Sequence, residues 1–212
     1  MMTGRVRGAA TLAGAVVMVL AGCAPATDDG APSGTTSEAA ATGSPVPAAR
    51  LAQSAHRAEP PVAATLPSGV VVPILSVSTT RDGRLDVPAD TGRAGWWRGG
   101  ARLGDPFGSI LVAAHVDSRT RGLGPFAELL GLGRGDRVVL ASAHLTQRFV
   151  VDSLRLVPQG PLTKERSLFE VTGSHRLTLV TCAPPYDRDR GGYQNLVVVT
   201  AVPSSPPSRD RS

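Results

Sequence analysis

Short apolar segments separated by Gly, Pro and Asp recur along the second two thirds of the chain, and most have the length of a β-strand. The segments that predict strands are residues 70–75, 109–114, 137–141, 147–157, 177–180 and 196–202. Only residues 126–132 have a helical pattern. Several short strands joined by turns favour an all-β domain, either a closed barrel or a sandwich.

Composition divides the chain into four parts: 1–22, 23–60, 61–203 and 204–212. Residues 23–60 are rich in Ala, Pro, Thr, Ser and Gly, so they cannot bury enough apolar surface to offset their ordering entropy. We expect a disordered tether with a reach of roughly 35 Å. Residues 61–203 are the expected folded domain, and the Pro- and Ser-rich residues 204–212 are the expected disordered tail.

The N-terminus has the features of an export signal. Arg5 and Arg7 precede fourteen residues, 9–22, that are apolar apart from one threonine. This run is shorter than the about 20 residues of a membrane span, but it suits the h-region of a signal peptide. It ends in Leu-Ala-Gly-Cys23, which resembles a bacterial lipobox and implies cleavage before Cys23 and lipidation of its thiol. The alternatives are an ordinary secretory signal with a chance cysteine, or a membrane anchor.

The charge pattern bears on the possible partners. The net charge is +5, but the arginines that supply it are scattered and form no basic block, which gives nucleic-acid binding little support. A basic surface facing acidic polymers of the cell envelope is at least as compatible with this pattern.

Two apolar strands end in reactive side chains. Residues 109–114 lead into His115, and residues 176–181 lead into Cys182. If the strands are neighbours in one barrel, thiol and imidazole meet at its rim, where an imidazolium lowers the pKa of a cysteine and prepares it as a nucleophile. Arg188 or Arg190 could stabilise a developing oxyanion. The alternative is structural: a buried cysteine often acts as a small hydrophobe, and a histidine at a strand end is often a satisfied structural residue.

Neither a metal nor a cofactor is predicted. His56, His144 and His175 are scattered over the tether and turns and have no ligand spacing around Cys182.

Two motifs carry a family resemblance: LDVPAD…GWWRGGARLGDPFGSILVAAHVDS and LTLVTCAPPYDRDRGGYQNLVVVTA. Over about residues 66–202 the chain resembles sortases, specifically the actinobacterial class F. This resemblance implies an eight-stranded β-barrel with short helices. It also implies a cysteine transpeptidase that cleaves an LPXTG-like sorting signal between Thr and Gly and passes the acyl group to an amine.

The resemblance assigns roles to individual residues. Cys182 matches the family nucleophile, and His115 matches the histidine that acts as general acid and then as base. The family arginine is matched best by Arg188, with Arg190 as the alternative, because the slot used by better-known sortases holds Asn195.

The sequence also departs from the family. Ala-Pro-Pro follows Cys182 where the family has two glycines, and Ala114 replaces the glycine before His115. Proline lacks an N–H group, so this loop offers fewer oxyanion donors.

Residues 158–171 correspond to the loop over the sorting-signal groove of sortases. Leu162, Leu168 and Phe169 are the expected contacts for apolar substrate residues, together with Thr181 beside the nucleophile; simple loop packing is the alternative. Asp117 either orients the His115 ring or caps the following loop.

The sequence therefore predicts a lipid-anchored transpeptidase at the outer face of the cytoplasmic membrane. Its expected partners are exported proteins with a sorting signal and an amine acceptor of the peptidoglycan-precursor or pilin type. Two alternatives remain: a thioester hydrolase of sorting signals, and a non-catalytic lipoprotein that binds envelope peptides.

Overall fold

The computed structural model describes residues 57–81, 83–159 and 166–209. Every described residue belongs to one compact unit, Arg50–Ser212. The predictions for the signal peptide, for Cys23, for most of the tether and for Leu162 lie outside the described residues.

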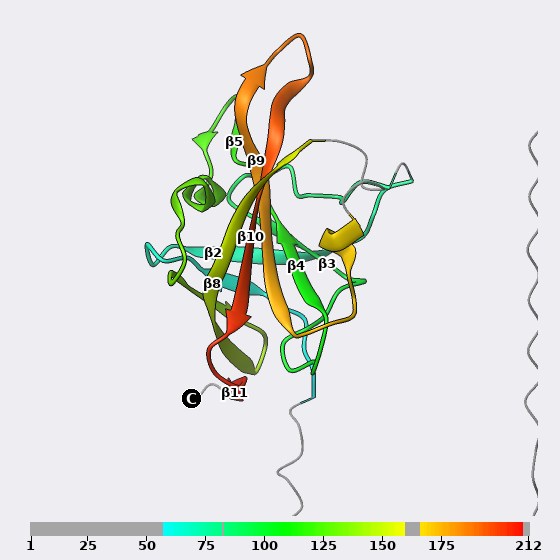
Figure 1. The fold of residues 1–212 in the computed structure, drawn as a ribbon, viewed down its shortest axis with the longest axis vertical. Helices are drawn as coiled ribbons and strands as arrows, with labels where there is room; N and C mark the ends of the chain where they lie inside the picture. The colour runs from blue at the N-terminus through cyan, green and yellow to red at the C-terminus, as the bar shows by residue number, and fades with distance from the viewer. Residues whose placement is uncertain (1–56, 82, 160–165, 210–212) are drawn as a thin grey trace, which may run out of the picture. The chain divides into compact units, whose positions relative to one another are not determined.

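Eight strands form a closed barrel in the order β10-β9-β4-β3-β2-β1-β7-β8, and pairing of β8 with β10 closes the ring (Figure 1). The strands are β1 (Ala63–Thr65), β2 (Val71–Val77), β3 (Ala94–Trp97), β4 (Ser109–Ala113), β7 (Arg137–Ala141), β8 (Leu145–Pro158), β9 (Arg176–Asp187) and β10 (Gly192–Pro203). The predicted eight-stranded barrel is confirmed. Strands β5 (Asp117–Ser118) and β6 (Gly122–Leu123) form a separate hairpin.

Two of the eight barrel strands, and the small hairpin of β5 and β6, were not predicted, and the predicted helical segment forms a different type of helix. Strands β1 and β3 read Ala-Ala-Thr and Ala-Gly-Trp-Trp, which lack the β-branched runs that signal a strand. The predicted helical segment forms a 3-10 helix, η1 (Pro125–Gly131), in which Phe126 and Leu129 are buried three positions apart. A second 3-10 turn, η3 (Arg166–Phe169), precedes β9.

Strand β4 is buried on both faces, which explains its wholly apolar central sequence. Ile110 and Val112 point into the barrel core, where they join Phe126 and Phe149. The alternate positions of β4, Leu111 and Ala113, face an outer cluster. That cluster also contains the buried residues Val157, Leu168, Val180 and Val198.

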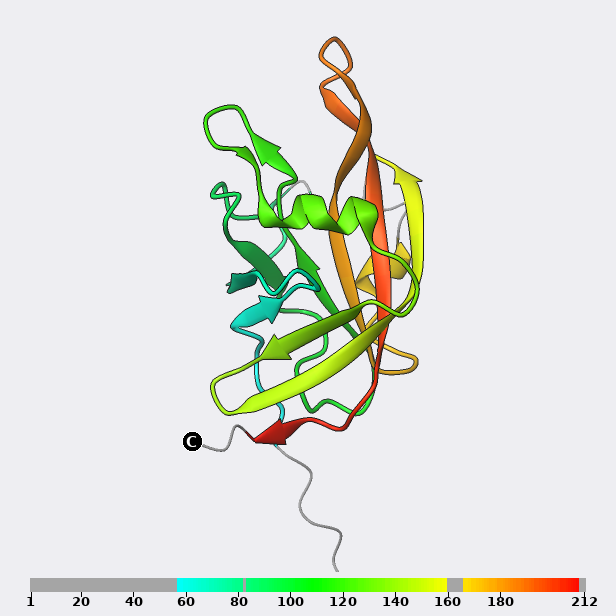
Figure 2. The same cartoon turned by 90° about the vertical axis from the view of Figure 1, so that its left-hand side faces the viewer.

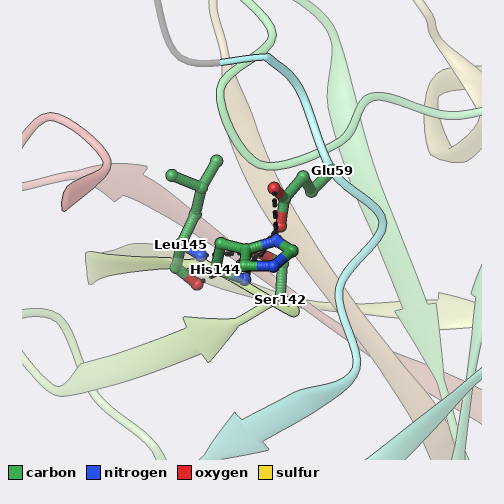
Figure 3. Close-up of polar contacts among 4 residues, drawn as sticks. All are labelled: Glu59, Ser142, His144 and Leu145. Atoms are coloured by element: carbon green, nitrogen blue, oxygen red, sulfur yellow. Dashed lines mark hydrogen bonds and ion pairs between the residues drawn. The ribbon is translucent and has the colours of Figure 1, made fainter. Parts of the chain in front are cut away.

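The folded region extends beyond both expected boundaries. Glu59 exchanges two backbone hydrogen bonds with Leu103, of 2.9 and 3.0 Å, and its carboxylate accepts hydrogen bonds from Ser142 Oγ (2.6 Å) and the His144 backbone N–H (3.0 Å) (Figure 3). The end of the predicted tether is therefore attached to the β7–β8 turn.

At the other terminus, β11 (Ser208–Arg209) pairs with β8, so residues 208–209 are not the disordered tail that composition predicted. Backbone pairing here depends on an available neighbouring strand, which composition does not reveal. Within the described ranges, no helix combines the length and apolar character needed to cross a membrane.

Candidate active site

Strands β4 and β9 run parallel side by side, and β9 continues beyond the end of β4 as far as Asp187, so Cys182 lies within β9 and not at a strand end as predicted. Their register pairs Ala113 with Val180, so His115 and Cys182 each lie two residues beyond the last pair. The alignment continues past the ladder, because the Ala114 N–H donates to the Val180 carbonyl (3.2 Å) and Thr181 Oγ1 donates to the Ala114 carbonyl (2.8 Å). The fold thus brings the predicted thiol and imidazole to matching positions on adjacent strands, with His115 exposed and Cys182 half-buried.

Cys182 borders a cavity of about 250 Å³. The β5–β6 segment and the long β9–β10 hairpin, which rise at the same end of the barrel in Figure 2, supply most of its wall. The lining residues are Asp117, Ser118, Arg119, Gln159, Cys182, Tyr186, Gly191, Gly192 and Tyr193. His115 does not line the cavity, although Asp117, two residues later, does.

The surroundings of Cys182 favour the neutral thiol. Desolvation is the larger cause that raises its pKa, and the negative charge of Asp117 adds to the effect. A nucleophilic role therefore requires a base that removes the thiol proton. His115 is a candidate for that base, because its imidazole is exposed and its backbone lies at the position that matches Cys182 in the register of β4 and β9.

Asp117 and Tyr193 form a polar pair across the cavity wall. Tyr193 OH donates to Asp117 Oδ2 at 2.8 Å, and this bond is the largest cause that raises the pKa of Tyr193 to about 12. The Tyr193 ring also meets the Tyr186 ring edge-on, with centroids 5.1 Å apart. The pair links the β5–β6 hairpin to β10 beside Cys182.

Neither of the two predicted arginines lines this cavity. Arg188 and Arg190 lie in the exposed turn between β9 and β10, and neither is a lining residue. Arg119 does line it. Arg119 was not among the residues predicted from the sequence; the signal that could have indicated it is its position four residues after His115 in the same motif.

The part of β9 that follows Cys182 has few backbone donors. Pro184 and Pro185 have no N–H, and the Asn195 side chain donates to the Pro184 carbonyl at 2.6 Å. Asn195 therefore holds this part of β9 from the paired strand β10. A developing negative charge near Cys182 depends all the more on side-chain donors.

The expected substrate contacts that the structure describes, Leu168, Phe169 and Thr181, do not line the cavity. Leu168 is buried in the outer cluster, and Phe169 packs edge-on against Trp97 with ring centroids 4.9 Å apart, so both hold η3 against the barrel wall. Thr181 is buried, and its hydroxyl is occupied by the Ala114 carbonyl.

Comparison with known proteins identifies the family. The family model described as the sortase domain matches residues 67–203, more than half of the chain. No curated protein matches this chain.

Several solved structures share the fold. Sortase E1 from Streptomyces coelicolor, with a tripeptide in its active site, is 18% identical with a TM-score of 0.53 over 71% of this chain and 91% of its own. Sortase C-1 from Actinomyces oris is 22% identical with a TM-score of 0.51 over 68% of this chain and 73% of its own. Sortase A from Listeria monocytogenes is 15% identical with a TM-score of 0.52 over 72% of this chain and 92% of its own. With this barrel and this domain match, the chain belongs to the sortase family, whose members are cysteine transpeptidases.

Proposed function

We propose that this chain is a class F sortase that cleaves an LPXTG-like sorting signal through a thioester on Cys182 and transfers the acyl group to an amine of the cell envelope. The observation that carries the proposal is the parallel register of β4 and β9, which places His115 and Cys182 each two residues beyond the last paired residues, with Cys182 at the cavity. A thiol and a neighbouring base are the minimum set for nucleophilic acyl transfer.

The raised pKa of Cys182 fits a mechanism in which the proton leaves during attack. His115 takes the thiol proton, sulfur attacks the scissile carbonyl carbon, and the imidazolium returns the proton to the leaving amine as the C–N bond breaks. The resulting thioester is opened by the acceptor amine, whose proton passes to His115 while the sulfur leaves.

Arg119 is the cation that we propose for the oxyanion, because it lines the cavity with Cys182 and the two prolines after Cys182 cannot donate. Arg188 and Arg190, which the sequence motif indicated, remain the alternative candidates for stabilising the oxyanion. Separate Arg→Ala variants at the three positions distinguish them: loss of about 100-fold or more in kcat, the usual effect of removing one oxyanion donor, should occur only for the arginine that serves.

Substrate recognition is proposed for the side of the barrel that carries η3. The outer cluster there is apolar, and Phe169 is only partly buried, so it can still contact an apolar residue of the signal. Leu162, Leu168 and Thr181 belong to the same proposal. Leu168 and Thr181 would act mainly by shaping the surface beneath the bound signal, since both side chains are buried.

The proposed location is the outer face of the cytoplasmic membrane, with lipid on Cys23. The described chain begins at the barrel end opposite the β9–β10 hairpin (Figure 1). A tether attached there would leave the cavity open toward exported proteins.

The test is incubation of the protein with LPXTG-type peptides, with and without an added amine, and mass analysis of the products. We expect an amide product with amine present, and none from Cys182→Ala or His115→Ala variants that melt like the wild type. Product from Cys182→Ala would refute the assignment. Release of free acid alone would favour a hydrolase, and peptide binding without turnover would favour a non-catalytic lipoprotein.

A further inference from the structure

Asp117 is an unusual neighbour for a cysteine nucleophile. It lines the same cavity as Cys182, and its negative charge opposes formation of the thiolate. Its Oδ2 accepts the Tyr193 hydroxyl at 2.8 Å, whereas among the described residues no hydrogen bond reaches Oδ1. The cavity wall therefore holds a carboxylate that is fixed at one oxygen and available at the other.

The rest of the lining carries little to neutralise this charge. Arg119 is the only basic residue in the wall, Asp117 is the only acidic one, and no ion pair joins them among the described side chains. Ser118, Gln159 and the two tyrosines are neutral. The cavity that Cys182 borders therefore has one negative side chain, Asp117, and one positive side chain, Arg119, with no ion pair between these two described residues. Such a wall can bind one positively charged and one negatively charged group of a ligand.

We propose that Asp117 binds the protonated amine of the acyl acceptor, and that Tyr193 orients the carboxylate for this contact. The inference rests on the proposed transpeptidase function and names how the acceptor is recognised. An ammonium is the positive group that must approach Cys182 in that reaction, and a charge-assisted hydrogen bond to a carboxylate is its strongest available contact.

The chemical step balances without any further reactant. The bound ammonium gives one proton to neutral His115 and becomes an amine. Its nitrogen attacks the thioester carbon, the C–N bond forms and the C–S bond breaks. The second proton of the nitrogen passes to the departing sulfur, so Cys182 ends as a thiol and His115 releases its proton to solvent.

The decisive measurement is the partition of the thioester between aminolysis and hydrolysis, because this ratio does not depend on how fast the thioester forms. Two nucleophiles are compared at neutral pH: Nα-acetyl-lysinamide, which is an ammonium, and hydroxylamine, which is neutral. Asp117→Asn keeps an acceptor for Tyr193 OH and removes only the charge. We expect it to raise the half-saturating concentration of the lysine probe by about tenfold, the effect of one charge-assisted hydrogen bond. Hydroxylamine has no charge for Asp117 to bind, so its half-saturating concentration should change much less than that of the lysine probe, and Asp117→Glu should restore the lysine probe.

An unchanged half-saturating concentration in Asp117→Asn overturns the proposal, as does an equal loss for both nucleophiles in a variant that melts like the wild type. If the variant is unstable, the wild type supplies the same test: added salt should weaken capture of the lysine probe and spare hydroxylamine, and equal salt effects overturn the proposal. Absence of any thioester in the wild type is a different result, because it refutes the proposed function itself.

Discussion

Thr181 offers a sharp test of how β9 and β4 are held together at the site. Its side chain is 2% exposed, and its hydroxyl donates to the carbonyl of Ala114, which is 4% exposed. The bond joins the residues directly before Cys182 and His115. Thr181→Val preserves the shape of the side chain and removes the donor, so the Ala114 carbonyl loses its Thr181 hydrogen bond.

The expected loss follows from burial of both groups. A buried polar group left without its partner costs about 1–3 kcal/mol. With a urea m-value of about 2 kcal/mol/M, a loss of 2 kcal/mol lowers the unfolding midpoint by about 1 M. Thr181→Ser is the matched control: it keeps the hydroxyl and loses one methyl group, about 0.8 kcal/mol.

Urea unfolding followed by tryptophan fluorescence measures both variants, and alkylation of Cys182 reports the site. We expect Thr181→Val to be less stable than Thr181→Ser, with an altered alkylation rate. Our account of the strand pairing is refuted if Thr181→Val loses less than about 0.5 kcal/mol, the lower limit for one hydrogen bond. A normal fold with selective loss of peptide turnover would instead identify Thr181 as a substrate contact.

Three further predictions concern charge and backbone. Because desolvation and then Asp117 raise the pKa of Cys182, its alkylation should increase only at alkaline pH, and Asp117→Asn should move the profile to lower pH; an unmoved profile contradicts the coupling. Hydrogen bonds, first that from the Ser142 hydroxyl, lower the pKa of Glu59 in the folded state, so its contribution to stability is present above the unfolded pKa and disappears as pH falls through the folded one. Glu59→Gln should therefore be less stable at neutral pH and equal to the wild type in acid, as measured by melting across pH. Gly108 has φ +88°, and an added Cβ would lie 2.7 Å from a backbone oxygen. Gly108→Ala should therefore lower the free energy of unfolding by about 2 kcal/mol or more. Gly133 has open space around it, so Gly133→Ala should unfold at nearly the wild-type midpoint.

The sequence predicted strands best where burial is two-sided. The run 109–114 in β4 is apolar at every position after Ser109 because one face meets the barrel core and the other meets the outer cluster. Strand β3 escaped prediction because its Gly and two Trp form no period, although Trp96 is buried and its indole N–H donates to the Ala101 carbonyl at 3.0 Å. Strand β1 is three small residues whose pairing on both sides comes from β2 and β7.

The candidate site was only partly predictable for a related reason. His115 and Cys182 stand out in the sequence because each follows an apolar run, and the motif supported both. The parallel register of β4 and β9 depends on residues far apart in the chain. From the sequence alone, a Cys182–His115 site could therefore be predicted only on the condition that the two strands are neighbours. The position of Arg119 at the cavity depends on how the β5–β6 hairpin is placed relative to the β9–β10 hairpin, and no local pattern of the sequence encodes that placement.

The central claim, that Cys182 and His115 work together at one end of the barrel, can be tested without a substrate. Methyl methanethiosulfonate caps the Cys182 sulfur, and NMR then follows the histidine ring resonances. We predict that the His115 resonances move on capping, while those of His144, in the β7–β8 turn at the opposite end of the barrel (Figure 1), stay in place. Complete modification of Cys182 with unmoved His115 resonances would contradict the account.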